Sequence, residues 1–223
     1  MNYYPLMLNI DGMPVTVIGG GDVAYRKIKD LLEKGAVVKV IAPEICAPIK
    51  ELLSVHYQKK LQILVRPYRA GDLVGARLVF SATNSADINE SVYREAMDKN
   101  IFINAADDPP HCTFIVPSYF LRGDLIVAVS TSGASPAMAA RIRKTIENSL
   151  PENIDSVLEL MKNVRSLLMN HEVFRERSSR ERGDLLKRIT SEDSLLDSML
   201  DAGDENDLVR ILQELMAQGE ENP

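Results

Sequence analysis

The hydrophobic pattern in the first half of the chain alternates between two periods. Short runs rich in Val, Ile and Leu predict β-strands, at Leu6–Ile10, Val15–Ile18, Val37–Ile41, Leu61–Val65, Leu78–Ala82 and Ile101–Ala105. Apolar residues three and four positions apart predict helices between these runs, at Val23–Glu33, Ala47–Val55 and Asp87–Lys99. Strands that alternate with helices are typical of βαβ units, so the pattern predicts a parallel sheet with a Rossmann-like core.

Turn-forming residues mark several of the connections. Asp11-Gly12 predicts a hairpin turn between the first two runs, and Gly35 predicts the end of the first helix. Pro67–Gly71 predicts a turn, followed by a short helix at Asp72–Gly75.

The pattern changes after Pro109-Pro110. Two further strands are predicted at Phe114–Val116 and Leu125–Ser130, and Pro136 is expected at the first position of the next helix. From Pro151 onward only helical periodicity remains, with a break near Ser178–Gly183 and a last helix at Leu208–Met216. The sequence therefore predicts an α/β fold: a Rossmann domain over residues 1–112, a small α+β segment over 113–150 and an all-helical region over 151–223.

Composition places the chain among globular proteins. Hydrophobic residues make up 45% and charged residues 26% of its 223 residues, which is enough to bury a core. No run approaches the roughly 18–20 apolar residues of a membrane helix, and the start of the chain does not read as a signal peptide. Only Cys46 and Cys112 are present, too few for a disulfide framework. A cytoplasmic protein with reduced thiols and no membrane partner is expected.

The net charge of −6 is unevenly distributed. Residues 1–183 carry 23 basic and 21 acidic side chains, whereas residues 184–223 carry 3 and 11. The acidity therefore belongs to the tail, and the body is slightly positive. The overall acidic balance argues against nucleic acid as a partner.

The strand Val15–Ile18 runs into a glycine-rich loop that predicts dinucleotide binding. Gly19-Gly20-Gly21-Asp22-Val23-Ala24 matches strand, G-x-G-x-x-A, helix. Gly19 permits the tight turn, Gly21 lets the backbone approach a pyrophosphate, and the helix N-terminus supplies amide donors. The alternative is a glycine-rich turn that is kept for packing alone.

The acidic residue that usually holds the NAD ribose is missing from the end of the second strand. The chain there reads Ala42-Pro43-Glu44, so Pro43 and Glu44 are expected to contact the ribose instead. No Arg stands there to bind a 2′-phosphate, which favours NAD over NADP. Thr83, directly after the strand Leu78–Ala82, is a further candidate for binding the cofactor.

Two later motifs carry candidate chemistry. Asp107, which follows the strand Ile101–Ala105, lies where open α/β sheets place ligands and could accept a proton as hydride leaves a substrate. The alternative is a pair of turn-capping aspartates, Asp107 and Asp108. The Ser132–Ser135 loop leads into a helix bearing Arg141, which suits a polyanion. Taken alone, however, this segment is explained better as an ordinary N-capped helix with a solvated basic face. The three histidines are not spaced as a metal site, so no metal ligands are predicted.

These motifs together resemble one family. Four segments occur in the order and spacing of the precorrin-2 dehydrogenase family, the dehydrogenase/ferrochelatase module of siroheme synthase. They are Tyr4-Pro5-Leu6, the loop from Val17 through Ala24-Tyr25-Arg26-Lys27, Asn104–Asp108 and Ser130–Pro136. The resemblance spans roughly residues 3–150. It is silent on the acidic tail.

The resemblance implies NAD-dependent oxidation of precorrin-2 to sirohydrochlorin and, in some members, insertion of Fe²⁺ to give siroheme. It implies that Asp107 is catalytic and that Asp22, Val23, Pro43 and Glu44 contact NAD, next to the glycine loop of Gly19, Gly20 and Gly21. It also implies that Ser132, Gly133 and Ser135 border the tetrapyrrole cleft, and that residues after about Phe114 form the dimerisation region of a homodimer. Because the substrate is a polycarboxylate, Arg141 is expected to line the same cleft. The competing hypothesis from a different class is a nucleotide-sensing Rossmann regulator without catalysis.

Overall fold

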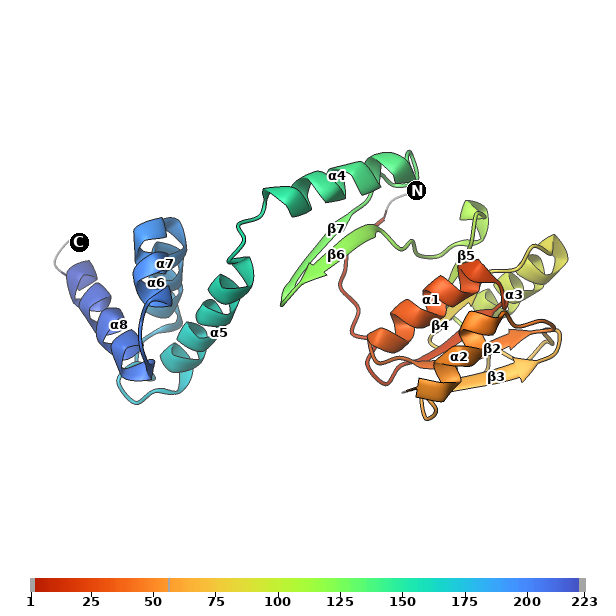
Figure 1. Cartoon of the computed structure of the whole chain (residues 1–223), viewed down its shortest axis with the longest axis horizontal. Coiled ribbons are helices and arrows are strands. Elements are labelled where there is room, and N and C mark those ends of the chain that lie inside the picture. The colour runs from red at the N-terminus through yellow and green to blue at the C-terminus, as the bar shows by residue number, and fades with distance from the viewer. Residues whose placement is uncertain (1–2, 56, 221–223) are drawn as a thin grey trace. The chain divides into compact units, whose positions relative to one another are not determined.

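The computed structural model describes residues 3–55 and 57–220, so His56 lies outside the described residues. Its first part is a five-stranded parallel sheet with the strand order β3-β2-β1-β4-β5 (Figure 1). The strands are β1 (Pro14–Ile18), β2 (Val37–Ala42), β3 (Leu61–Val65), β4 (Leu78–Ser81) and β5 (Phe102–Ala105). The predicted Rossmann-like core is confirmed.

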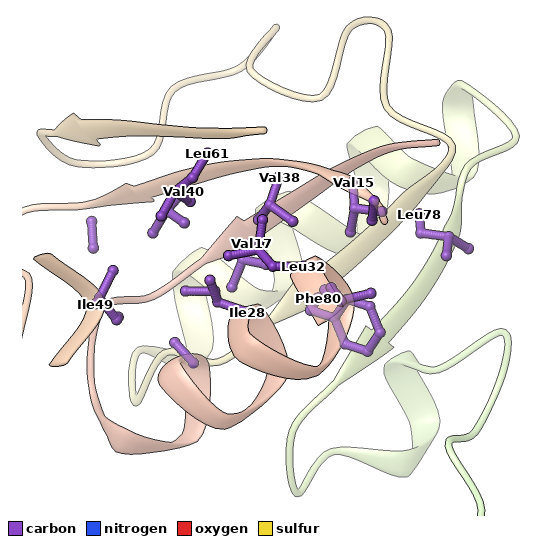
Figure 2. Packing of buried hydrophobic residues seen from close by; sticks show 14 of the residues in the cluster. Val15, Val17, Ile28, Leu32, Val38, Val40, Ile49, Leu61, Leu78 and Phe80 are labelled. Carbon is purple, nitrogen blue, oxygen red and sulfur yellow. The ribbon is translucent and has the colours of Figure 1, made fainter. Parts of the chain in front are cut away.

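Helices cover both faces of this sheet. Successive residues of each strand point to opposite faces, and the side chains on both faces are apolar. Val15 and Val17 point toward α1 (Asp22–Glu33) and α2 (Ala47–Val55), in the cluster shown in Figure 2. Ile18 and its neighbours on the other face pack with α3 (Ala86–Asp98). Burial of both faces explains why these strands read as continuous hydrophobic runs.

The first helix ends where the sequence predicts. Gly35 has a φ of +87°, and its N–H donates to the carbonyl of Leu32 while the N–H of Ala36 donates to that of Leu31. This φ lies in the left-handed region that favours glycine, and a Cβ at Gly35 would also displace the carboxylate of Asp11.

The chain divides into two compact units. The first comprises the residues up to Val116 together with the short stretch Ser132–Ala134, and the second comprises the rest of the described chain. This unit contains an antiparallel ribbon of β6 (Ser118–Arg122) and β7 (Leu125–Val129), with α4 (Pro136–Ser149) packed against it. Four helices follow: α5 (Ile154–Asn170), α6 (Ser179–Ser191), α7 (Asp193–Leu200) and α8 (Glu205–Glu220). They share a hydrophobic core centred on Val164, Leu168, Phe174, Ile189 and Leu212. The predicted helical C-terminal region is confirmed.

Two predicted strands are wrong. Leu6–Ile10 is irregular, because no strand in the described part of the chain pairs with it, and Leu6 and Met7 are largely exposed. Asp11-Gly12 therefore forms a turn that does not join two strands of a hairpin. Phe114–Val116 is also irregular: Thr113 bonds Ile103 through its main chain and hydroxyl, and the Phe114 ring packs edge-on against Phe80. Its apolar character reflects this packing, and the strand begins at Ser118 instead.

Two predicted helix features also differ. Asp72–Gly75 forms turns rather than a helix, since Arg66 and the N–H of Arg69 both bond the Asp72 carboxylate and fix the local chain. The break near Ser178–Gly183 is earlier than predicted, at residues 171–178. Ser178 caps α6 in a reciprocal capping box with Glu181, so the helix begins at Ser179 and continues through Gly183.

Candidate functional site at the carboxyl edge of the sheet

The sheet order places a topological switch point at the carboxyl end of β1. The chain passes from β1 to β2 on one side, whereas β4 lies on the other, so the connections after β1 and β4 diverge here. Open α/β sheets bind ligands at such a switch point. The Gly19–Gly21 loop leaves β1 at this place and leads directly into α1.

The first two glycines are required by the protein's own packing. Gly19 has a φ of +126°, and a Cβ there would lie 2.1 Å from the carbonyl oxygen of Ala82. A Cβ at Gly20 would lie 2.0 Å from the carbonyl oxygen of Glu44. The loops that follow β4 and β2 are therefore in direct contact with the glycine turn.

Gly21 differs from its neighbours. Its φ is −91°, and a Cβ built there would have no atom of the described protein within 4 Å. Neither strain nor packing requires a glycine at this position. The open space beside Gly21, in front of the first amides of α1, fits the close approach of a phosphate group to the backbone.

Pro43 and Glu44 lie beside this loop, as the sequence predicts. The N–H of Cys46 donates to the carbonyl of Gly20 (2.8 Å), which holds the β2–α2 connection against the glycine turn. Pro43 and Glu44 are exposed, as are Asp22 and Val23 at the start of α1. The structure thus brings four of the predicted cofactor residues, all of them exposed, beside the glycine turn.

Thr83 is held in place by an interaction that sequence reasoning missed. The buried side chain of Asn89, on α3, donates to the Thr83 carbonyl (3.2 Å) and accepts from the hydroxyl of Ser81 (2.7 Å). The Thr83 hydroxyl accepts from the N–H of Ser85 (3.0 Å). A polar Asn on the apolar face of a predicted helix was the available signal.

Asp107 lies two strands away from the glycine turn, after β5. Asp107 is exposed. Its backbone φ of +57° lies in the left-handed region, which is uncommon for residues other than glycine. The N–H of the preceding Ala106 donates to the carbonyl of Ser81 (2.8 Å), so the start of this loop is tied to β4. The backbone thus presents the carboxylate outward at the ligand-binding edge.

Asp108, in contrast, is committed to a partner. His111 lies in the 3₁₀ turn η1 (Pro109–His111), and its Nδ1 is 2.7 Å from Oδ2 of Asp108. Its Nε2 is 2.8 Å from Oε2 of Glu90 on α3, and its ring packs edge-on against Tyr93. The bond to Asp108 raises the pKa of His111, and the Glu90 carboxylate adds to the effect. This cluster fastens the Asp107 loop to α3.

The His111 cluster makes stability depend on pH. Because its pKa is raised in the folded state, His111 contributes stability that is fully present below its unfolded pKa and is lost as pH rises through the folded pKa. The melting temperature of the wild type should therefore fall, relative to His111→Gln, over the range in which the pH rises above the unfolded pKa of about 6.5. Thermal melts of both proteins across this range measure it. Parallel curves would contradict the ion-pair account.

The cluster does not form a metal site. Both ring nitrogens of His111 bond carboxylates, and the described residues include no group of three His, Cys, Asp or Glu side chains placed to hold a metal ion.

None of the described helices is both long and apolar enough to cross a bilayer.

The Ser132–Ser135 loop combines an open turn with a helix cap. Ser132 and Gly133 have φ values of +53° and +89°, are exposed, and form the outer part of the loop. The Ser135 hydroxyl accepts from the N–H of Met138 (3.2 Å) and caps α4, while its own hydrogen stays available to a ligand. Arg141 is exposed on α4, whereas Arg143 is paired with Glu147.

Family models match both parts of this arrangement. One described as putative NAD(P)-binding matches residues 6–118, half of the chain, and one described as sirohaem biosynthesis protein central matches residues 122–149. A solved structure named SirC, precorrin-2 dehydrogenase, aligns over 96% of this chain and 98% of its own, with a TM-score of 0.74 and 26% identity. The chain belongs to the precorrin-2 dehydrogenase family.

Curated relatives of this family are longer proteins. A siroheme synthase from Pseudoalteromonas translucida is 36% identical over 74% of this chain but only 34% of its own length. One from Vesicomyosocius okutanii is 38% identical over 74% of this chain and 35% of its own. The chain thus spans about a third of the length of these relatives.

Proposed function

We propose that this chain oxidises precorrin-2 to sirohydrochlorin with NAD as the oxidant. The proposal rests above all on the open backbone beside Gly21, which shares the ligand-binding edge of one sheet with the outward carboxylate of Asp107. The likeness to a precorrin-2 dehydrogenase along nearly the whole of both chains supports it.

In this proposal the glycine turn and the exposed residues beside it hold the cofactor. The amides at the start of α1 bind the pyrophosphate next to Gly21, and residues 43, 44 and 83 border the nucleotide, together with Asp22 and Val23. The carboxylate of Glu44 belongs to one of these exposed residues and would repel a 2′-phosphate, which favours NAD over NADP. Bound NAD supplies the hydride acceptor.

Asp107 then acts as the base. Oxidation of precorrin-2 removes a hydride from carbon and a proton, so the site needs a group that accepts the proton as the hydride leaves. A carboxylate at the end of β5 that no described residue bonds is suited to this role. Ser132, Gly133, Ser135 and Arg141 would contact the substrate's carboxylates, with hydroxyls, an amide-rich turn and a guanidinium.

Incubation with precorrin-2 and NAD separates this proposal from a nucleotide-sensing regulator. The proposal predicts formation of sirohydrochlorin together with NADH. A regulator would bind NAD without converting precorrin-2, and that outcome would refute the proposed activity. Adding Fe²⁺ to the product tests the iron insertion that the resemblance implies for some members.

We further propose that residues 113–150 form a homodimer interface, between an NAD-binding domain at 1–112 and the helical region at 151–223. Leu121 and Ile126 lie directly opposite each other on β6 and β7, and their side chains are 50% and 46% exposed. A two-stranded ribbon is marginally stable alone, and its exposed apolar pair favours burial against a second copy. The two free thiols of Cys46 and Cys112 are consistent with a cytoplasmic location.

A charge on this ribbon should disrupt the dimer. Ile126→Lys places two ammonium groups in a two-fold interface and is expected to weaken dimerisation by about 100-fold or more. Sedimentation velocity measures the monomer fraction. The control is Val74→Lys, which changes another exposed apolar residue, in a loop of the first unit. An unchanged dimer in Ile126→Lys would contradict this interface.

A further inference from the structure

Lys27 is the second of the two cations in the Arg26-Lys27 motif, and nothing described above uses it. It lies on α1 and is half-buried. Within residues 3–55 and 57–220, its Nζ has no hydrogen bond or ion pair. Its Nζ lies over the ring of Phe80, 5.8 Å from the ring centroid. That distance is at the outer limit for a cation–π contact.

Asp30 lies at a spacing from which it could form an ion pair with Lys27, but the structure shows no such pair. Asp30, one turn further along α1, forms an ion pair with Lys34 instead. Burial lowers the pKa of Lys27, and the neighbouring Arg26 lowers it further, with Asp30 opposing both from a distance. The protein therefore keeps a partly desolvated ammonium group without a bonded counter-ion, which is costly unless a ligand supplies one.

Contacts connect Lys27 to β5, the strand that precedes Asp107. The Phe80 ring beneath Lys27 packs edge-on against Phe114, with ring centroids 5.5 Å apart. The carbonyl of Phe114 accepts from the side chain of Asn104 (3.1 Å), and Asn104 is three residues before Asp107 on the same strand and its following loop. The ammonium group thus belongs to the part of the first unit that leads to the proposed base.

We propose that Lys27 binds a carboxylate of the tetrapyrrole substrate. This inference rests on the proposed function, which supplies a polycarboxylate as the ligand. The dinucleotide is the other source of an anion, but its pyrophosphate is served by the amides at the start of α1. Lys27 lies five residues beyond Asp22, about 7.5 Å along the helix axis. Its aromatic neighbours are those of the Asp107 side of the sheet.

Lys27→Met tests this role, because methionine keeps the apolar stem and its packing on Phe80 while removing the charge. The expected result is a KM for precorrin-2 raised by about tenfold or more, because a charge-assisted hydrogen bond is lost. The Kd for NAD and the melting temperature should stay at wild-type values. Lys27→Arg should restore most of the lost affinity. Lys29→Met, on the exposed side of the same helix, is the matched control and should behave as wild type.

Any one of the following results would overturn the inference. A normal KM in Lys27→Met would show that the charge binds no substrate. A raised Kd for NAD with a normal KM would assign the charge to the cofactor, and a lowered melting temperature with all binding intact would make it structural. Equilibrium binding of sirohydrochlorin to wild type and Lys27→Met separates this inference from the proposed function. If neither protein oxidises precorrin-2 the activity is refuted, whereas equal sirohydrochlorin binding refutes the role of Lys27.

Discussion

Asp107→Asn is expected to lower kcat for precorrin-2 oxidation by about 100-fold or more, since a positioned general base contributes roughly 10²–10⁴-fold. Asparagine keeps the size of the side chain and tolerates the left-handed backbone that Asp107 adopts, with its φ of +57°. The substitution therefore removes the ionised oxygen without straining the loop. Steady-state kinetics at saturating NAD and precorrin-2 measure the effect.

The control for this variant is Asp98→Asn, which removes one negative charge from an exposed position at the end of α3. Asp98→Asn should retain wild-type kcat, and Asp107→Asn should retain the wild-type Kd for NAD and melting temperature. Turnover by Asp107→Asn within a few-fold of wild type would show that another group accepts the proton. A lowered melting temperature would show instead that Asp107 acts through the fold.

The second large effect separates two glycines of one loop. Gly19→Ala combines a φ of +126° with a Cβ only 2.1 Å from a backbone oxygen, so it should destabilise the fold by about 3 kcal/mol or more. Gly21→Ala meets no atom of the described protein and should leave the melting temperature nearly unchanged. Its methyl group would occupy the space beside the α1 amides, and the Kd for NAD should rise by about tenfold or more.

Thermal melts and calorimetric titration with NAD measure both properties on the same samples. The two variants serve as controls for each other, because each adds one methyl group within the same turn. If Gly21→Ala bound NAD as the wild type does, the phosphate site would not lie beside Gly21. If Gly19→Ala melted as the wild type does, the turn would tolerate a rearrangement that its packing argues against.

Local signals were sufficient to predict the Rossmann core. β-Branched runs bounded by turns gave the five parallel strands, and Gly35 gave the end of the first helix. The prediction failed where partners decide structure. Leu6–Ile10 has the composition of a strand, but hydrogen bonding to a neighbour makes a strand, and the described chain provides none. Phe114–Val116 is apolar because Phe114 packs on Phe80.

The site shows the same division. The glycine loop and the position after β5 could be predicted, because motif and topology place them at one edge of the sheet. Residues that act through tertiary contacts could not. Asn89 holds the Thr83 loop from α3, and Glu90 reaches His111 across some twenty positions of sequence. Lys27 has no ion pair within the described chain because Asp30 pairs with Lys34 instead. Both lysines are within three or four residues of Asp30, so the spacing along the helix does not predict which pair forms.

The central claim is that hydride passes from precorrin-2 to NAD on this chain. Precorrin-2 carrying deuterium at the carbon that is oxidised should, with NAD and the wild-type protein, give sirohydrochlorin and deuterated NADH in equal amounts. Mass spectrometry of the nicotinamide, with the tetrapyrrole spectrum recorded on the same sample, provides both quantities. Sirohydrochlorin formed without label in NADH, or NAD bound with precorrin-2 left intact, would contradict the account.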